Sequence, residues 1–323
     1  MKMRYCNIFY TIIITFLFFI TGCDGTAFDI TEDANASLKI FAFGGLDTVG
    51  ATTRLSSVEA YNPSTNTWEA KTSMPSGRSL IAEEAGGLIY AIGGYDGSIC
   101  LSKVEVYDPI NDEWSLKTSM PTARGGFAAT EVNGLIYALG GTDGSTCLTT
   151  VEVYNPTSNT WTTKASMSTE RNGVGAVSLD GLIYAIGGHD GVNTLSSVEV
   201  YNPATNTWTS KASMFTARRG LSVVTYNGLI YSIGGHDGTN YLSSIEVYNP
   251  STNAWTSKAS MSTAKYTFGA VEVNGLIYAI GGLNGTNVLK IVEVYNPATN
   301  TWATKTSMST ARCGCGAAAA KGL

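Results

Sequence analysis

The only two histidines of the chain occur in nearly identical stretches. IYAIGGHDG spans residues 183–191 and IYSIGGHDG spans residues 230–238, so His189 and His236 are 47 positions apart. Histidine is a frequent general base and metal ligand, and two histidines on one surface could form a catalytic or metal-binding pair. A duplicated unit would also copy a histidine that has no such role. The repeat must therefore be defined before either histidine is interpreted.

Arginine is the other residue type whose spacing suggests chemistry, because its planar guanidinium group matches carboxylate and phosphate oxygens. Five of the seven arginines that follow residue 22 recur at equivalent positions along the chain, which we call the arginine column. Lys265 occupies a sixth position of this column, and Arg219 follows one of its members. The column consists of Arg78, Arg124, Arg171, Arg218 and Arg312. Only Arg54 lies elsewhere.

Six copies of a unit of about 47 residues cover the chain from Leu38 to its end. Gly-Gly pairs begin at Gly44, Gly93, Gly140, Gly187, Gly234 and Gly281, and the tryptophans keep the same register. In the copy that contains His189, the pattern predicts four short strands, A to D, over 172–179, 182–186, 196–201 and 207–211. The pairs Asp180-Gly181 and Asn202-Pro203 are typical of turns.

A four-stranded unit repeated at this length is typical of a β-propeller blade. The Gly-Gly pair, the VEVYNP stretch and the tryptophan at fixed spacing resemble the kelch repeat in all six copies. We therefore expect an all-β, six-bladed kelch β-propeller with four antiparallel strands in each blade. The first copy lacks strand A and the chain ends in a spare one, so the C-terminal strand should complete the first blade and close the ring. A truncated seven-bladed ring is the alternative, because Gly322-Leu323 aligns with the start of another strand B.

The N-terminus is typical of a secretory signal. Lys2 and Arg4 precede an apolar run over 8–20, and Thr21-Gly22-Cys23 resembles the end of a bacterial lipobox. We expect a signal peptide over 1–22, a lipidated Cys23 with a tether over 23–37, and the propeller over 38–323. The protein would then be extracytoplasmic, in the periplasm or at the cell surface, and membrane-anchored through Cys23. An ordinary signal peptide and an uncleaved anchor are the alternatives.

One position varies while its neighbours repeat. The residue after each Gly-Gly pair is Leu46, Tyr95, Thr142, His189, His236 or Leu283. Strand alternation places this position and the arginine column on the same face. In kelch substrate receptors the matching positions contact ligand, so the resemblance implies a ligand-binding rim of Tyr95, Thr142, His189, His236, Arg78, Arg124, Arg171, Arg218, Arg219 and Arg312. The alternative is that each column arginine pairs with the aspartate of a nearby Asp-Gly turn, such as Asp190.

The regularity of the copies favours a binding module that recognises a protein, peptide or glycan, anionic ligands included, as a monomer without cofactor. The net charge of −5 argues against a nucleic-acid partner, and no Cys/His spacing typical of a zinc site is present. The glutamates of the VEVYNP stretches occur in every copy, which favours a structural role. The alternative is a sugar-active enzyme resembling the secreted kelch N-acetylneuraminate epimerases, with Glu170 beside Arg171 as the base.

Overall fold

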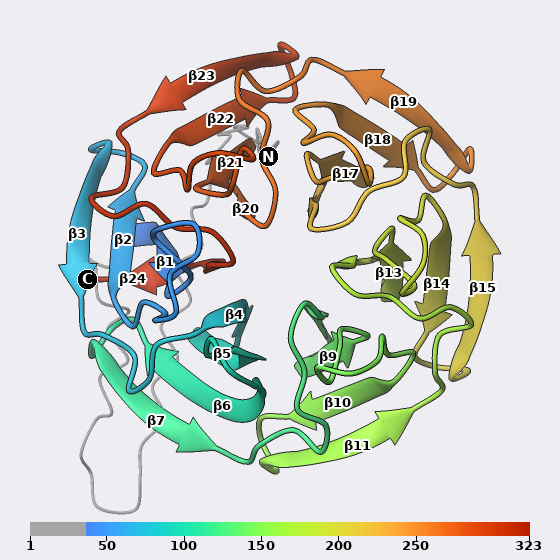
Figure 1. Ribbon diagram of the computed structural model, residues 1–323, viewed down its shortest axis with the longest axis horizontal. Helices are drawn as coiled ribbons and strands as arrows, with labels where there is room; N and C mark the ends of the chain where they lie inside the picture. Colours follow the sequence, from blue (N-terminus) through green and yellow to red (C-terminus); the bar gives the residue numbers. More distant parts are fainter. Residues whose placement is uncertain (1–36) are drawn as a thin grey trace, which may run out of the picture. The chain divides into compact units, whose positions relative to one another are not determined.

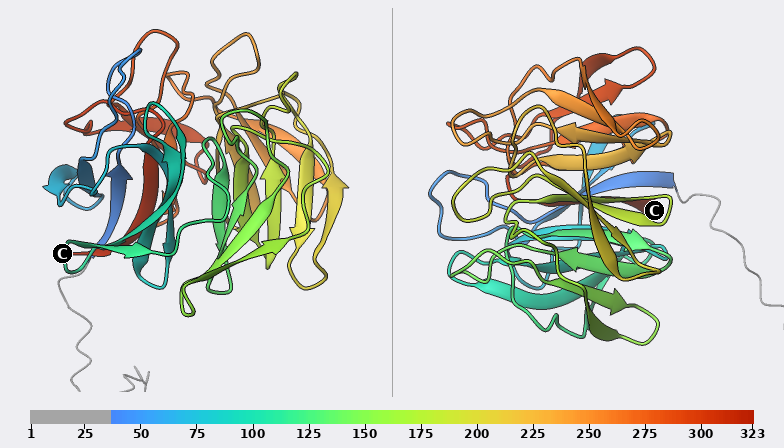
Figure 2. Two further views of the ribbon diagram at one scale, coloured as in Figure 1. Left: turned by 60° about the horizontal axis from the view of Figure 1, so that its bottom comes forward. Right: turned by 90° about the vertical axis from the view of Figure 1, so that its right-hand side faces the viewer.

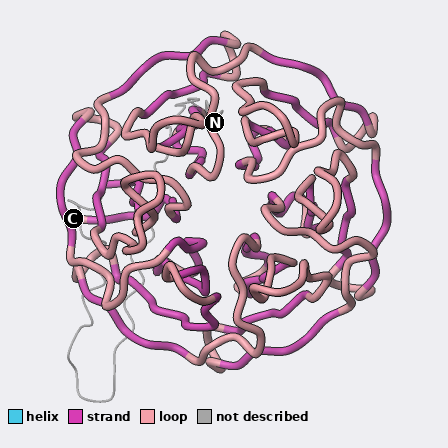
Figure 3. The backbone as a smooth tube through the Cα atoms, in the orientation of Figure 1, coloured by secondary structure: helices cyan, strands magenta, loops and turns pink. Residues whose placement is uncertain are grey.

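Six four-stranded antiparallel sheets stand around a central axis as the blades of a propeller (Figure 1). The structure, a computed structural model, describes residues 37–323, so the predicted signal peptide, Cys23 and the tether up to residue 36 lie outside the described residues. Strands, turns and loops make up all of 37–323, without a helix (Figure 3). No helix in that range could span a membrane.

The blades follow the sequence in order, each listed from the innermost strand outward. Blade 1 consists of β24 (Gly316–Gly322), β1 (Ser37–Phe43), β2 (Val58–Asn62) and β3 (Thr67–Lys71). Blade 2 consists of β4 (Ser79–Ala85), β5 (Leu88–Tyr95), β6 (Cys100–Asp108) and β7 (Glu113–Lys117). Blade 3 consists of β8 (Ala128–Val132), β9 (Leu135–Leu139), β10 (Val151–Asn155) and β11 (Thr160–Lys164).

The second half of the ring has the same construction. Blade 4 consists of β12 (Gly175–Leu179), β13 (Leu182–Ile186), β14 (Val198–Asn202) and β15 (Thr207–Lys211). Blade 5 consists of β16 (Ser222–Tyr226), β17 (Leu229–Ile233), β18 (Ile245–Asn249) and β19 (Ala254–Lys258). Blade 6 consists of β20 (Gly269–Val273), β21 (Leu276–Ile280), β22 (Val292–Asn296) and β23 (Thr301–Lys305). The predicted architecture of six blades with four strands each is confirmed.

The ring closes where the first and last strands pair. β24 runs antiparallel to β1 over seven residues, with Phe41 opposite Ala318, and the alanines of β24 that face the sheet interior are buried. The C-terminal strand therefore completes blade 1, as expected from the spare strand A. This pairing leaves β1 without an open edge.

Turn chemistry sets the length of each strand. Asp180 and Gly181 join β12 to β13 with φ values of 52° and 74°, the left-handed conformations that a tight hairpin turn requires. Between β14 and β15, Asn206 has φ of 56°. Asparagine and aspartate tolerate this conformation better than most residues do, and the other blades have asparagine or, in blade 2, Asp112 at this position.

Aromatic residues and one asparagine join neighbouring blades. Tyr201 of β14 is fully buried and donates its hydroxyl to Asn206 Oδ1 at 2.7 Å. The same oxygen accepts the Ala165 N–H of blade 3 at 2.9 Å, and Trp208 Nε1 donates to the Ala165 carbonyl at 2.8 Å. Tyr201 also packs against Tyr137 of blade 3, with ring centroids 6.0 Å apart. The tyrosine and tryptophan columns therefore fill the space between blades, as the sequence indicates.

Strand direction places two kinds of connection on each face. The connections from strand D to strand A, and those from B to C, lie on one face, which we call the loop face. The tight A–B and C–D turns lie on the opposite face. Figure 2 shows the ring from the side, with the longer connections gathered at one face. The variable positions after the Gly-Gly pairs belong to the B–C connections, so we expect the site on the loop face.

Candidate functional site

The five column arginines point into the blades. Each is 0% exposed. Arg171 precedes β12, yet its guanidinium group reaches β14 of the same blade and lies 2.9 Å from Glu199. The equivalent pairs are Arg78–Glu105, Arg124–Glu152, Arg218–Glu246 and Arg312–Glu59. These side chains have no surface to offer a ligand, so the expectation that they line a ligand-binding rim is wrong for these five residues.

The contacts of Arg171 show why it is buried. Its Nη1 donates to the carbonyls of Gly187 and Ser197 at 2.6 and 3.1 Å, and its Nη2 donates to Ser197 Oγ at 2.9 Å. Glu199 also accepts hydrogen bonds from the Ser168 N–H and hydroxyl at 2.8 and 2.6 Å. Burial alone would raise the pKa of Glu199, but these hydrogen bonds and Arg171 outweigh it and lower the pKa. The pair therefore holds the loop from blade 3 against blade 4.

The aspartates of the Asp-Gly turns do not pair with the arginines either. Asp190 Oδ1 accepts the backbone N–H groups of Val192 and Asn193 at 2.8 and 2.6 Å. These two hydrogen bonds are the main reason why the pKa of Asp190 is lowered. The aspartate thus stabilises its own turn, and the alternative that it neutralises a column arginine is also wrong. The glutamate column takes that role, which confirms the structural interpretation of those glutamates.

The variable residues after the Gly-Gly pairs do lie together on the loop face. Each forms an antiparallel bridge with the residue that follows the column cation of its blade, so six residue pairs surround the axis. The pairs are Leu46–Cys313, Tyr95–Ser79, Thr142–Gly125, His189–Asn172, His236–Arg219 and Leu283–Tyr266. The position after the column cation also varies between copies, and this signal in the sequence could have identified Ser79, Tyr266 and Cys313.

The two histidines use one ring nitrogen within their own turns. His189 Nδ1 accepts the Gly191 N–H at 3.0 Å, and His236 Nδ1 accepts the Gly238 N–H at 3.0 Å. In blade 3, Thr142 Oγ1 likewise accepts the Gly144 N–H at 3.1 Å. An imidazole that accepts a hydrogen bond through Nδ1 in its neutral form carries its proton on Nε2. Within 37–323 no three His, Cys, Asp or Glu side chains cluster in a way that could hold a metal ion.

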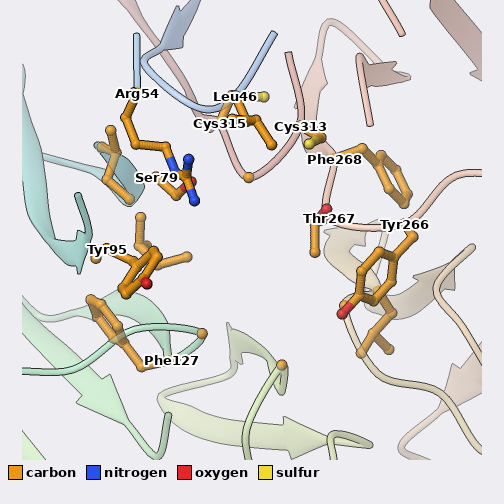
Figure 4. A pocket seen from close by; sticks show the side chains of 18 of the residues that line it. Leu46, Arg54, Ser79, Tyr95, Phe127, Tyr266, Thr267, Phe268, Cys313 and Cys315 are labelled. Atoms are coloured by element: carbon orange, nitrogen blue, oxygen red, sulfur yellow. The ribbon is translucent and has the colours of Figure 1, made fainter. Parts of the chain in front are cut away.

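A pocket of about 500 Å³ opens at the centre of the loop face. Its polar groups include Arg54, Ser79, Tyr95, Tyr266 and Thr267, and all six blades contribute to its lining (Figure 4). Apolar side chains form the rest, among them Leu46, Ile81, Phe127, Val174, Leu221 and Phe268. A concave, mostly apolar pocket of this size with a few polar groups is typical of small-molecule sites. Of the predicted rim residues, only Tyr95 lines it; Thr142, His189, His236 and Arg219 lie around it.

A ring of residues, most of them glycine, contributes to the lining of this pocket. The Gly173 N–H donates to the Gly126 carbonyl at 2.6 Å, and the Gly220 N–H donates to Gly173 at 2.8 Å, linking successive blades. In blade 6 the equivalent residue is Thr267, which continues the ring by donating to Gly220 at 2.8 Å. Its φ is 47°, whereas Gly220 has 57°. A β-branched residue in this conformation is strained, and such strain tends to persist at functional sites.

Three aromatic rings pack at the edge of the pocket between blades 5 and 6. The His236 centroid lies 4.8 Å from that of Tyr241 and 5.9 Å from that of Tyr266, both edge to face. Tyr241 and Tyr266 are 6.0 Å apart at 82°. Burial and the nearby charge of Arg219 lower the pKa of His236. The His236 ring is therefore a neutral, largely apolar wall at neutral pH.

Arg54 and Arg219 are the two arginines within 37–323 that form no ion pair. Arg54 donates through Nη1 to the Ala51 carbonyl at 2.9 Å and lies over the Tyr95 ring, 5.4 Å from its centroid. The Nε of each is buried and has no hydrogen-bond partner, which is also true of Arg124, Arg218 and Arg312 in the column. Arg54 reaches the pocket because the B–C loop of blade 1 has nine residues, 46–54, whereas that of blade 4 has six, 189–194.

The proposed acid–base pair of Glu170 and Arg171 is not assembled. Glu170 is exposed and is absent from the pocket lining, whereas Arg171 is buried against Glu199. A general base must lie within hydrogen-bond reach of the substrate proton. The geometry of these two residues therefore gives no support to an enzyme that uses them.

Known proteins with similar sequences or folds agree with this architecture. The model for the KLHDC2/KLHL20/DRC7 Kelch-repeats domain matches residues 39–214 and 117–267, and the Kelch motif matches residues 264–309. No curated protein matches the chain. A solved structure described as "Structure of YjhT" is similar with a TM-score of 0.70 and 14% sequence identity, over 82% of this chain and 97% of that one. That likeness shows the fold alone, but the family model covers more than half of the sequence, and the chain belongs to the kelch-repeat family of β-propellers.

Proposed function

We propose that this protein is a non-catalytic binding module that recognises its ligand on the loop face, in and around the axial pocket. The observation that carries this proposal is the distribution of variation. Residues inside the blades are nearly the same in all six copies, whereas the six bridged pairs around the axis differ from copy to copy. The fold does not dictate these positions, so they are free to serve recognition.

The ligand contacts of this proposal differ from those expected from the arginine column. Tyr95, Thr142, His189, His236 and Arg219 remain, because each is at least partly exposed on the loop face. Arg54, Ser79, Tyr266 and Thr267 join them, because they line the pocket. A protein, a peptide or a glycan could occupy this surface, and the protein acts as a monomer outside the cytoplasm.

Binding on the loop face is tested with two variants at opposite sides of the pocket. Peptide, glycan and metabolite libraries are screened for compounds that raise the melting temperature of the purified protein. For any such ligand, Tyr95→Ala and His236→Ala should each weaken binding about tenfold or more, which corresponds to about 1.4 kcal/mol. Lys211→Ala, on the outer strand β15, is the matched control and should bind normally. Unchanged binding in both pocket variants would refute the proposal.

The extracytoplasmic location rests on the lipobox-like ending at Cys23 and is tested separately. In a bacterial host with its own lipoprotein machinery, the wild-type protein should fractionate with membranes and carry lipid on its first residue. The Cys23→Ser variant should lose the lipid and move to the soluble fraction or remain as the uncleaved precursor, because the acylated thiol is gone. A wild-type protein recovered without lipid would contradict the anchor.

A further inference from the structure

We infer that the axial pocket binds a small amphipathic monocarboxylate, with its apolar body in the pocket and its carboxylate on Arg54. This inference rests on the proposed function, since it concerns the same site, and it names a small molecule as the ligand in place of a protein, peptide or glycan. Two features of the pocket carry it: the guanidinium group of Arg54 without an acidic partner, and the apolar walls beneath that group.

Arg54 supplies the anion-binding group. The five column arginines have their charge neutralised by buried glutamates, whereas Arg54 forms no ion pair. Asp96 is the acidic neighbour of Arg54. The pKa of Asp96 is lowered mainly by hydrogen bonds from the Ile99 and Ser98 N–H groups, and the charge of Arg54 makes a smaller contribution. That carboxylate is committed to its own turn. A ligand carboxylate would therefore find the guanidinium group of Arg54, with its Nη2 donors, at the mouth of the pocket.

The walls of the pocket supply the site for an apolar body. Tyr95 and Tyr266 come from blades 2 and 6 and lie on opposite sides of the opening (Figure 4). Phe127 and Phe268 also line the pocket and are almost fully buried. A volume of about 500 Å³ accommodates a ligand of the size of a substituted aromatic or branched aliphatic acid. A fully hydrophilic ligand would leave these walls without complementary groups.

Blade 6 departs from the repeat at the positions that shape this wall. Tyr266 follows the column cation, where blades 2 and 3 have Ser79 and Gly125. A Cβ atom at Gly220 would lie 2.2 Å from the Tyr266 ring, so the ring can occupy this position only because residue 220 is glycine. Thr267 keeps its strained φ of 47° beside it. Residues that the fold disfavours, gathered on one side of a pocket, are most simply explained by contact with a ligand.

The charge around the pocket selects against larger anions. Five aspartates, Asp47, Asp96, Asp143, Asp190 and Asp237, lie in the B–C loops of blades 1 to 5. Glu170 adds a sixth carboxylate on the loop face, while Arg219 and Lys290 add cations to Arg54. Within the B–C loops the five aspartates outnumber the two cations, Arg54 and Lys290, so a polyanion lying along these loops would be repelled before reaching Arg54. A single carboxylate on an apolar body avoids this repulsion.

Fluorine NMR with two matched probes tests the inference. A fluorophenylacetate and the corresponding neutral fluorophenylacetamide have the same apolar body and differ in charge. Addition of the purified protein should broaden the acid signal, and the acid should bind at least about tenfold more tightly than the amide. Arg54→Gln should abolish the preference for the acid, Tyr266→Ala should weaken both probes, and Lys211→Gln should change neither. Polyglutamate should not displace the acid.

The outcomes separate this inference from the broader proposal. Equal binding of acid and amide, a preference retained in Arg54→Gln, no broadening with either probe, or displacement by polyglutamate would each overturn the monocarboxylate assignment. If Tyr95→Ala and His236→Ala still weakened a different ligand from the library screen, recognition on the loop face would stand with another ligand class.

Discussion

Arg171→Met is expected to reduce the free energy of unfolding by about 3–5 kcal/mol, the range found when one member of a buried ion pair is removed. The substitution leaves Glu199 buried with its charge, and it deprives the carbonyls of Gly187 and Ser197 of their donor. Methionine fills part of the space but supplies no hydrogen bond. Urea denaturation at neutral pH, followed by tryptophan fluorescence, measures the change.

Three further measurements make this result specific. Lys211→Met, an exposed lysine in the same blade, should change stability by less than about 0.5 kcal/mol. Replacing both Arg171 and Glu199 by methionine should cost less than the sum of the single changes, because no buried charge remains unpaired. In Arg171→Met, burial should raise the pKa of Glu199, so the deficit should shrink as the pH falls and the carboxylate takes up a proton. A fully stable Arg171→Met protein that fails to bind ligand would instead restore this arginine to the binding surface.

The architecture of the blades was predictable because it depends on short-range signals repeated six times. Asp180-Gly181 between two apolar runs predicts a tight hairpin turn, and the registers of Tyr201 and Trp208 locate the third and fourth strands. Closure through β24 followed from counting strands. Each of these inferences needed only the position of a residue along the backbone.

The direction of the long side chains was not predictable in the same way. The sequence places the Cα atom of Arg171 on the loop face, but several rotatable bonds separate that atom from the charge. Its true partner, Glu199, is 28 residues away on the third strand of the same blade, whereas Asp190 is nearer in sequence and already satisfied by its own turn. One signal was present: every copy carries one column cation and one glutamate, and Lys265 preserves the charge where arginine is absent.

The pocket was only partly predictable. Variation after the Gly-Gly pairs identified Tyr95, and the same reasoning applied to the residue after the column cation would have added Ser79 and Tyr266. Arg54 could not be placed, because the extra length of its loop does not determine where the loop folds. The structure shows that it folds inward over the Tyr95 ring.

The double substitution Lys265→Arg with Ile291→Ser is expected to stabilise the protein by about 1–2 kcal/mol at neutral pH, through hydrogen bonds that the other blades already have. Lys265 lies 3.4 Å from Glu293, farther than the 2.9 Å between Arg171 and Glu199. Four column arginines also donate to a hydroxyl on strand C or just before it, such as Ser197 Oγ, and Ile291 occupies that position in blade 6. Arginine and serine together complete the network.

The single variants test whether the two changes act as a unit. Lys265→Arg alone would direct a donor at the Ile291 side chain, and Ile291→Ser alone would remove apolar contacts without gaining a partner. The double variant should therefore be more stable than the sum of the single effects predicts, by about 1 kcal/mol or more in a double-mutant cycle. Simple additivity would show that the hydroxyl and the guanidinium group do not interact in blade 6.

The pH dependence of this stabilisation has a definite sign. Burial lowers the pKa of Lys265 from 10.5 to about 8. Below about pH 8 the lysine is protonated in both the folded and the unfolded protein, and the cost of its buried charge is fully present. Between about pH 8 and 10.5 the unfolded chain holds this proton and the folded protein releases it, so the wild-type protein gains stability by up to about 1.4 kcal/mol per pH unit. Arginine does not titrate in this range, and the buried tyrosines are common to both proteins.

The advantage of the double variant over the wild type should therefore be largest at neutral pH and shrink as the pH rises above 8. An advantage that stays constant over this interval would show that Lys265 remains charged in its buried position.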